Sequence, residues 1–145
     1  MLKKLFCFLL FAFGFLFCLD DVSAQTLSDG VYKIRSAVAN DKMIDLYGGF
    51  TTNNTNIQLW QNNEGSNQKW IVKHLSHDYY TIASYQDESM VMDVHGALKK
   101  LGTNVELFKG NGGDNQQWLI KYAGEGYYNI ISKCNGLFLD VYGGL

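Results

Sequence analysis

The sequence predicts an all-β domain built from copies of one repeat about 48 residues long. Three sets of evenly spaced residues support this prediction, and each set keeps its local context from copy to copy. They are a tyrosine set, an aspartate set and a tryptophan pair: Tyr32, Tyr80 and Tyr128; Asp45, Asp93 and Asp140; Trp70 and Trp118. The spacing is 48 residues throughout, apart from 47 between the last two aspartates. Repeats that cannot bury their apolar faces alone must share one centre.

Each repeat reads as four short strands separated by clusters of glycine and asparagine. In the first repeat the strands are expected at 31–36, 43–47, 57–61 and 68–75, where apolar and polar residues alternate. No stretch of useful length shows helical periodicity. Two and a half copies are too few for a propeller, whereas three copies that close a small barrel leave no free sheet edge. The predicted architecture is therefore a small barrel with pseudo-threefold symmetry and an incomplete third repeat.

The first 24 residues have the pattern of a secretory signal peptide. Lys3 and Lys4 precede an apolar run of 15 residues, and Ala24 offers a cleavage site. A helix of that length spans about 22 Å, which is short of the ~30 Å core of a membrane. A lipoprotein signal acylated at Cys18 is disfavoured by the bulk of Phe17. We therefore expect a secreted protein that is not inserted in a membrane after cleavage.

The remaining segment, 25–145, carries little net charge and one cysteine. Removing Lys3, Lys4, Asp20 and Asp21 leaves 10 basic and 12 acidic residues, so the net charge stays at −2. That balance gives no general attraction to nucleic acid or anionic lipid. Cys134 has no partner for an internal disulfide, so stability must come from a packed core, which 121 residues can supply.

Two Gln-x-Trp motifs occur in register, Gln68-Lys69-Trp70 and Gln116-Gln117-Trp118, and each follows an apolar-Asp-apolar strand. In this combination the chain resembles the ricin B-type lectin family of β-trefoils over residues 29–145. The resemblance implies one lectin domain, 25–145, with repeats at about 29–76 and 77–124 and a partial repeat at 125–145. It also implies that each repeat gives two strands to a six-stranded barrel and two to a capping hairpin, and carries one shallow sugar site.

The resemblance places the best-matched sugar site in the first repeat, at Asp45, Gln58, Trp60, Asn67 and Gln68. Because strand residues alternate between faces, Gln58 and Trp60 share one face independently of any family. An exposed indole covers the apolar face of a sugar ring, while a carboxylate and an amide hydrogen-bond its hydroxyl groups. The glutamine of the Gln-x-Trp motif is also expected to tie down backbone beside the site.

The other two repeats match less well. The second site is expected at Asp93, Phe108, Asn115 and Gln116, and it is predicted to be weaker because Glu106 replaces the amide of the first repeat and brings like charge close to the aspartate. The third offers Asp140 and Tyr142 before the sequence stops. An incomplete third repeat predicts unpaired strand edges. We therefore expect the chain to be a fragment of a longer protein or to borrow strands from a partner.

Several other features are expected to be structural. Trp70 and Trp118 alternate with apolar neighbours and are predicted to lie in the core. His74 and His77 stand three apart at a strand end, where they point to different sides and have no third ligand nearby, so no metal site or cofactor is expected. Cys134 lies in a turn segment without a base to activate it.

Three classes of function remain open. The first is a non-catalytic lectin that binds glycans or polysaccharide and targets an attached catalytic domain or toxin. The second is a glycoside hydrolase in its own right, which requires two carboxylates about 5–9 Å apart; the repeated aspartates should instead occupy separate sites. The third is a protein-binding trefoil, such as a protease inhibitor.

Overall fold

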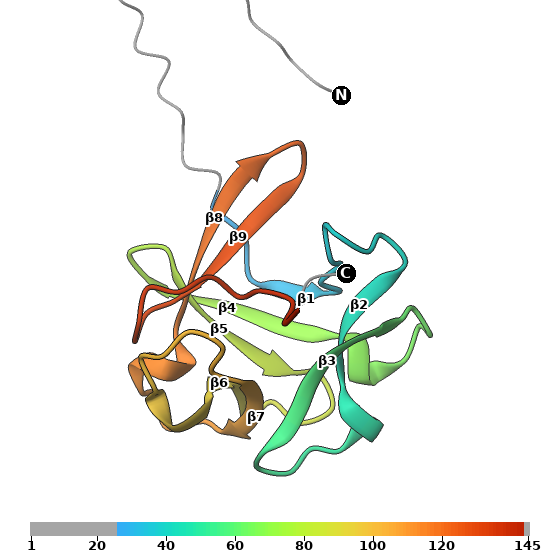
Figure 1. Ribbon diagram of the computed structural model, residues 1–145, viewed down its shortest axis with the longest axis horizontal. Coiled ribbons are helices and arrows are strands. Elements are labelled where there is room, and N and C mark those ends of the chain that lie inside the picture. Colours follow the sequence, from blue (N-terminus) through green and yellow to red (C-terminus); the bar gives the residue numbers. More distant parts are fainter. Residues whose placement is uncertain (1–25, 144–145) are drawn as a thin grey trace, which may run out of the picture.

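The computed structural model describes residues 26–143, so the predicted signal peptide lies outside the described residues. The described chain is all-β, as predicted, with four single-turn 3₁₀ helices (η) between its strands (Figure 1). The strands are β1 (Gly30–Tyr32), β2 (Lys42–Leu46), β3 (Thr55–Gln61), β4 (Trp70–Ser76), β5 (Tyr79–Ser84), β6 (Met90–Val94), β7 (Val105–Lys109), β8 (Trp118–Gly124) and β9 (Tyr127–Ser132). The 3₁₀ helices are η1 (Tyr47–Gly49), η2 (Ser66–Gln68), η3 (His95–Ala97) and η4 (Asp114–Gln116).

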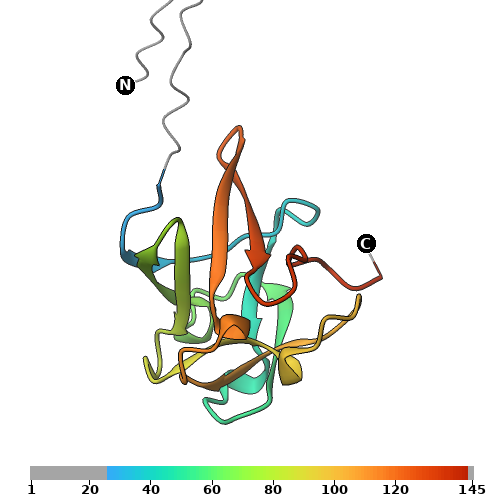
Figure 2. The same cartoon turned by 90° about the vertical axis from the view of Figure 1, so that its left-hand side faces the viewer.

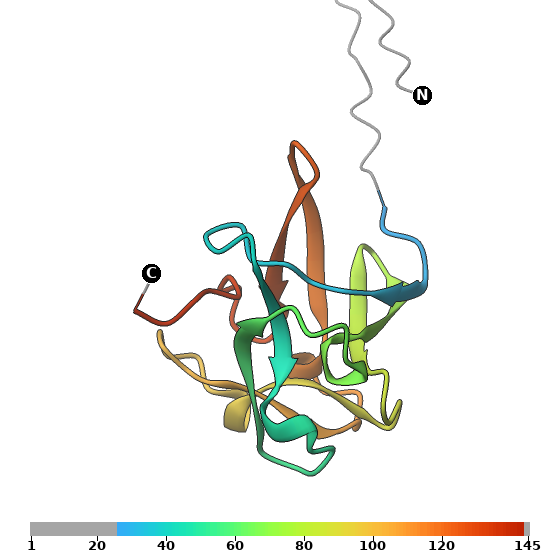
Figure 3. The same ribbon diagram turned by 90° about the vertical axis from the view of Figure 1, so that its right-hand side faces the viewer.

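The first and second repeats divide their strands as expected for a β-trefoil. The first and fourth strands of each repeat form an antiparallel series in the order β1, β4, β5, β8 and β9. The second and third strands form the hairpins β2–β3 and β6–β7. Figures 2 and 3 show the β8–β9 hairpin standing at one end of the molecule and β6–β7 at the other.

The third repeat contributes less. Within residues 26–143, β9 pairs with β8 and forms one further bridge, from Ile131 to Phe138. In the same range β1 pairs with β4 alone. The described residues therefore contain five strands of the expected six-stranded barrel, and those from Leu139 to Gly143 form irregular chain.

The two tryptophans of the Gln-x-Trp motifs lie in the core, as predicted. Trp70 and Trp118 are fully buried, and Tyr80, Ile82 and Met92 are buried with them. Each indole N–H donates to a carbonyl oxygen of the hairpin in its own repeat, Trp70 to Ile44 and Trp118 to Met92, both at 3.1 Å. Each tryptophan thus fills the core with its ring and ties barrel to hairpin with its one polar atom.

One strand is shorter than predicted. The strand expected at 31–36 pairs with β4 only over Gly30–Tyr32. The chain then changes partner: Ile44 N donates to Ile34 O at 2.8 Å, Ser36 N donates to Lys42 O at 3.0 Å, and Arg35 forms a bridge with Met43. Residues 34–36 thereby become a neighbour of the β2–β3 hairpin.

Candidate functional site

A hollow of about 410 Å³ opens beside the β2–β3 hairpin, next to η1 and η2. Four of the five residues predicted for the first site lie around it. The residues that line it are Asp45, Tyr47, Gly48, Gly49, Phe50, Gln58, Trp60, Asn63 and Asn67. The hairpin register explains the grouping, since Asp45 stands opposite Gln58, and Met43 opposite Trp60. Cross-strand partners and residues two apart share one face of a sheet.

Asp45 lies at the bottom of this hollow and is held by three amide groups. Only 2% of the surface of Asp45 is exposed to solvent. Gln58 Nε2 donates to Oδ1 at 3.1 Å, while Asn67 Nδ2 and Gln68 Nε2 donate to Oδ2 at 2.7 and 2.9 Å. A carboxylate can accept about four hydrogen bonds. The protein therefore uses three, and one direction on Oδ1 is left for a donor that enters the hollow.

The structure corrects the role predicted for Gln68. It was expected among the ligand-binding residues, but it has no exposed surface and so cannot contact a molecule in the hollow. Besides its bond to Asp45, Gln68 Nε2 donates to Gln61 O at 2.8 Å, and its Oε1 accepts from Asn63 N at 3.0 Å. Gln68 therefore positions Asp45 and the chain at the end of β3, in line with the backbone-tying role also expected for it.

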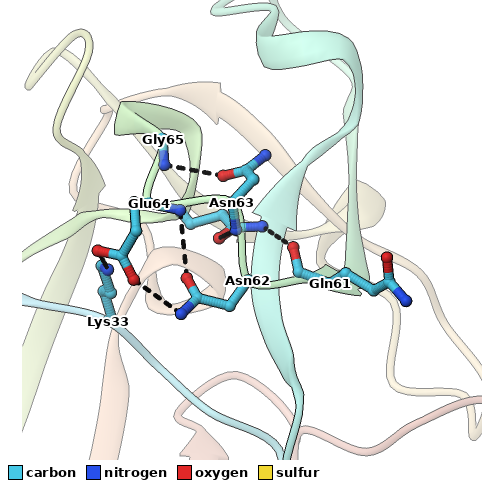
Figure 4. Close-up of polar contacts among 7 residues, drawn as sticks. Lys33, Gln61, Asn62, Asn63, Glu64 and Gly65 are labelled. Atoms are coloured by element: carbon cyan, nitrogen blue, oxygen red, sulfur yellow. Dashed lines mark hydrogen bonds and ion pairs between the residues drawn. The ribbon is translucent and has the colours of Figure 1, made fainter.

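The chain that follows β3 is held by its own side chains (Figure 4). Asn62 Nδ2 donates to Glu64 Oε1 at 2.8 Å, and Gly65 N donates to Asn63 Oδ1 at 2.8 Å. Lys33 forms an ion pair with Glu64. Hydrogen bonding from Lys33, followed by that from Asn62, lowers the pKa of Glu64. These contacts fix Asn63 at the rim of the hollow although the loop is exposed.

Aromatic side chains frame the hollow. Trp60 is 55% exposed, and Tyr47 and Phe50 are exposed to a similar extent. Gly48 permits the close approach of Phe50, because a Cβ atom at Gly48 would lie 2.4 Å from the Phe50 ring. Its φ of +62° is also one that residues with side chains rarely adopt. A flat molecule with an apolar face can thus stack on Trp60 while its polar edge faces Asp45.

Sequence reasoning did not select Tyr47, Phe50 or Asn63. Repeat spacing offers a signal for Asn63, since Asn111 stands 48 residues later and each precedes a Gln-x-Trp glutamine by five positions. Tyr47 could have been found as the residue two after the repeated aspartate. Phe50 carries no such signal, because Leu98 occupies its place in the second repeat.

The second repeat keeps the aspartate and two of the three amides that hold it. Asn115 Nδ2 and Gln116 Nε2 donate to Asp93 Oδ2 at 2.9 and 2.7 Å. Gln116 is buried like Gln68 and also donates to Lys109 O, so its predicted ligand-binding role is corrected in the same way. Burial raises the pKa of Asp93, the hydrogen bonds from Gln116 and Asn115 oppose this, and the charge of Glu106 raises it further.

The rest of the second site differs from the first. Glu106 is buried and stands opposite Asp93, as the predicted like-charge pairing requires. Its Oε1 lies 2.9 Å from His95 Nδ1, a contact that the sequence analysis did not anticipate. His95 occupies the position of Tyr47, two residues after the aspartate. Phe108 is half-buried, whereas Trp60 is more exposed. The second site therefore presents less aromatic surface and more negative charge.

The third site is not assembled within the described residues. Asp140 lies outside any strand, and its Oδ1 accepts a hydrogen bond from the backbone of Val141 at 2.7 Å. Tyr142 is 93% exposed. Between residues 26 and 143 no amide side chain holds Asp140 in the way that Asn67 holds Asp45.

In residues 26–143, no group of three or more His, Cys, Asp or Glu side chains is arranged to hold a metal ion. Over that range, none of the helices has both the length and the apolar character needed to cross a membrane.

Comparison with known proteins supports the β-trefoil fold and the predicted family. The family model described as ricin-type beta-trefoil lectin domain-like matches residues 21–108 and again 66–145. The designed threefold-symmetric protein ThreeFoil is similar, with a TM-score of 0.75 and 31% identity over 79% of this chain and 81% of its own. A lectin of Polyporus squamosus, solved with a human-type influenza-binding epitope, has a TM-score of 0.72 and 25% identity over 81% of this chain and 41% of its own.

Two similar proteins are much longer than the matched segment. Flavastacin of Elizabethkingia meningoseptica is 34% identical over 58 residues, which cover 40% of this chain and 13% of flavastacin. An exo-beta-1,3-galactanase from Clostridium thermocellum has a TM-score of 0.65 and 26% identity, over 74% of this chain and 22% of its own.

Proposed function

Because the chain belongs to the ricin-type β-trefoil lectin-like family, we propose that it is a non-catalytic carbohydrate-binding module. Its working site is the hollow around Asp45, with Gln58, Trp60 and Asn67 as the residues that contact sugar. One observation carries the proposal. A buried carboxylate, held by three amides, keeps one accepting direction open beside a half-exposed indole.

The chemistry of a sugar fits this arrangement. Its hydroxyl groups donate to a charged acceptor in hydrogen bonds that are stronger than neutral ones. The C–H face of its ring covers the indole of Trp60 and removes apolar surface from water. The hollow is open and shallow, so water remains around the ligand. A dissociation constant near the millimolar range, about −4 kcal/mol, is expected for one sugar unit.

The competing proposal of a glycosidase has less support. Hydrolysis of a glycosidic bond requires two carboxyl groups on either side of it, and among the described residues that line the hollow only Asp45 is acidic. In the second site Asp93 and Glu106 stand side by side on paired strands rather than facing each other across a cleft.

The natural context that we propose is a secreted lectin module that directs an attached catalytic domain or toxin to glycans. The pattern of residues 1–24 supports secretion. The matched segment covers only 13% of flavastacin and 22% of the galactanase. This small share supports a role as one module among others.

The test is a glycan array with the purified full chain and three variants. Asp45→Asn keeps the shape of the site but gives the sugar an amide in place of a carboxylate. Trp60→Ala removes the stacking surface. Tyr127→Ala is the matched control, because Tyr127 is an exposed aromatic residue on the distant β8–β9 hairpin.

We expect binding that both site variants reduce at least tenfold and that the control retains, with melting curves showing all four proteins folded. Sugar binding that survives Asp45→Asn and Trp60→Ala would refute the proposed site. Turnover of chromogenic glycosides that is lost in Asp45→Asn would favour the glycosidase instead.

A further inference from the structure

A second hollow, of about 440 Å³, adjoins the proposed sugar site. We call it the Arg35 hollow; its lining residues are Arg35, Asn40, Asp41, Met43, Gln61 and Asn62. Both hollows have volumes within the range of small-molecule sites.

A row of residues on one face of the β2–β3 hairpin connects the two hollows. Met43 is the cross-strand partner of Trp60, and Arg35 is bridged to Met43, so Arg35, Met43 and Trp60 form a row across three neighbouring segments. Partners in such a row have side chains on one face, with Cβ atoms about 5 Å apart. A ligand stacked on Trp60 therefore reaches Met43 and Arg35 without crossing the sheet.

The loop after β3 joins the hollows from the other side. Asn63 lines the Asp45 hollow, whereas Gln61 and Asn62 line the Arg35 hollow. Figure 4 shows these three consecutive residues, the last of β3 and the first two of the loop, each taking part in hydrogen bonds. The backbone of the second hollow is also fixed, because Asn62 N donates to Asp41 O at 3.2 Å and Gln68 holds Gln61 O.

We propose that the Arg35 hollow binds the next sugar unit of an oligosaccharide whose first unit occupies the Asp45 hollow. The inference rests on the proposed function. The lining offers hydrogen-bond donors on Arg35, both donors and acceptors on the amide side chains of Asn40 and Gln61, and a carboxylate acceptor on Asp41. A methionine supplies apolar surface at Met43.

The charges in this hollow indicate which kind of sugar unit it takes. Arg35 and Asp41 are both exposed and carry opposite charges, so the lining is close to neutral. Within residues 26–143 neither of them takes part in an ion pair. Their polar groups are therefore available to hydroxyl groups, and the balance of charge favours a neutral unit over an acidic one.

The experiment measures affinity against chain length. Isothermal titration with one-, two- and three-unit neutral oligosaccharides of the sugar found on the array gives a dissociation constant for each length. The proteins are the wild-type chain, Arg35→Ala, Asn40→Ala and the double variant. Lys121→Ala serves as the control, because it removes one positive charge from an exposed position on β8.

We expect the wild type and the control to bind two units about tenfold more tightly than one unit, with little further gain from the third. The double variant is expected to bind one unit as the wild type does and to lose the gain from the second. Equal affinity for one and two units in the wild type would overturn this inference and leave the proposed function standing. A lack of binding to every length would overturn both.

Discussion

Replacing Gln68 tests the idea that its amide, rather than its size, builds the site. The buried side chain makes three hydrogen bonds, to Asp45, Gln61 and Asn63, at 2.8–3.0 Å. A typical hydrogen bond contributes about 1 kcal/mol to stability. Gln68→Met keeps the volume and loses all three, so its free energy of unfolding should fall by about 3 kcal/mol. Gln68→Ala also leaves a cavity of about 50 Å³, which at about 24 cal/mol per Å³ adds about 1 kcal/mol.

Urea unfolding, followed by tryptophan fluorescence, measures both values, and an unchanged slope with urea would show that the denatured state is not altered. Gln117→Ala is the control. Gln117 is the middle residue of the second motif, is partly exposed, and makes its contacts with Gly112 and Lys133 at the surface, so a loss below about 1 kcal/mol is expected. The reasoning fails if Gln68→Met is as stable as the wild type, because the three bonds would then contribute nothing net.

Two predictions concern the second site. Sugar binding there is measured in the Asp45→Asn variant, in which the first site is expected not to bind. The pKa of Asp93 is raised above its ordinary value of 3.8, mainly by burial. Residual sugar binding should therefore fall as the pH drops through that raised pKa, in titrations from neutral pH to about pH 4. The free energy of unfolding follows the opposite course. The raised pKa of Asp93 stabilises the folded state at a pH below the ordinary pKa of 3.8, and this stabilisation is lost as the pH rises through the raised pKa. Asp93→Asn should remove this dependence from melting temperatures, and an unchanged profile would contradict it. Second, Glu106→Gln restores the amide of the first site and should strengthen residual binding severalfold in glycan titrations; equal or weaker binding would show that the carboxylate is not the cause of the difference.

The sequence was sufficient to predict which side chains of the first repeat lie together around the hollow at Asp45, for a geometric reason. A strand has a period of two residues and a hairpin pairs residues directly, so an aspartate on β2 and a Gln-x-aromatic pair on β3 must share a face if the register is right. The register places Asp45 opposite Gln58. The burial of the two tryptophans was equally predictable, because a large apolar ring that alternates with apolar neighbours is usually buried in the core.

The errors arose where the chain leaves the regular strands. The family resemblance places Gln68 among the sugar-binding residues, but η2 turns its side chain inward, where Gln61 O, Asn63 N and Asp45 satisfy its amide. His95 was overlooked because it follows β6 in the turn η3, and only the fold brings it back to Glu106. Turn geometry depends on tertiary contacts that the alternation of residues does not encode.

The comparison of the two complete repeats separates what the Gln-x-Trp motif does from what binds a ligand. In both repeats the glutamine holds the aspartate and the end of the third strand, and the tryptophan ties the barrel to the hairpin. The motif therefore stabilises the fold, and its presence alone does not predict affinity for a sugar. The positions that differ are those that line the hollow of the first repeat: Gln58 and Trp60 are replaced by Glu106 and Phe108, and Tyr47 and Phe50 by His95 and Leu98. Because the glutamine, the tryptophan and the aspartate that they support are the same in both repeats, exchanging these four residues between repeats should transfer binding strength from one site to the other without a large change in stability.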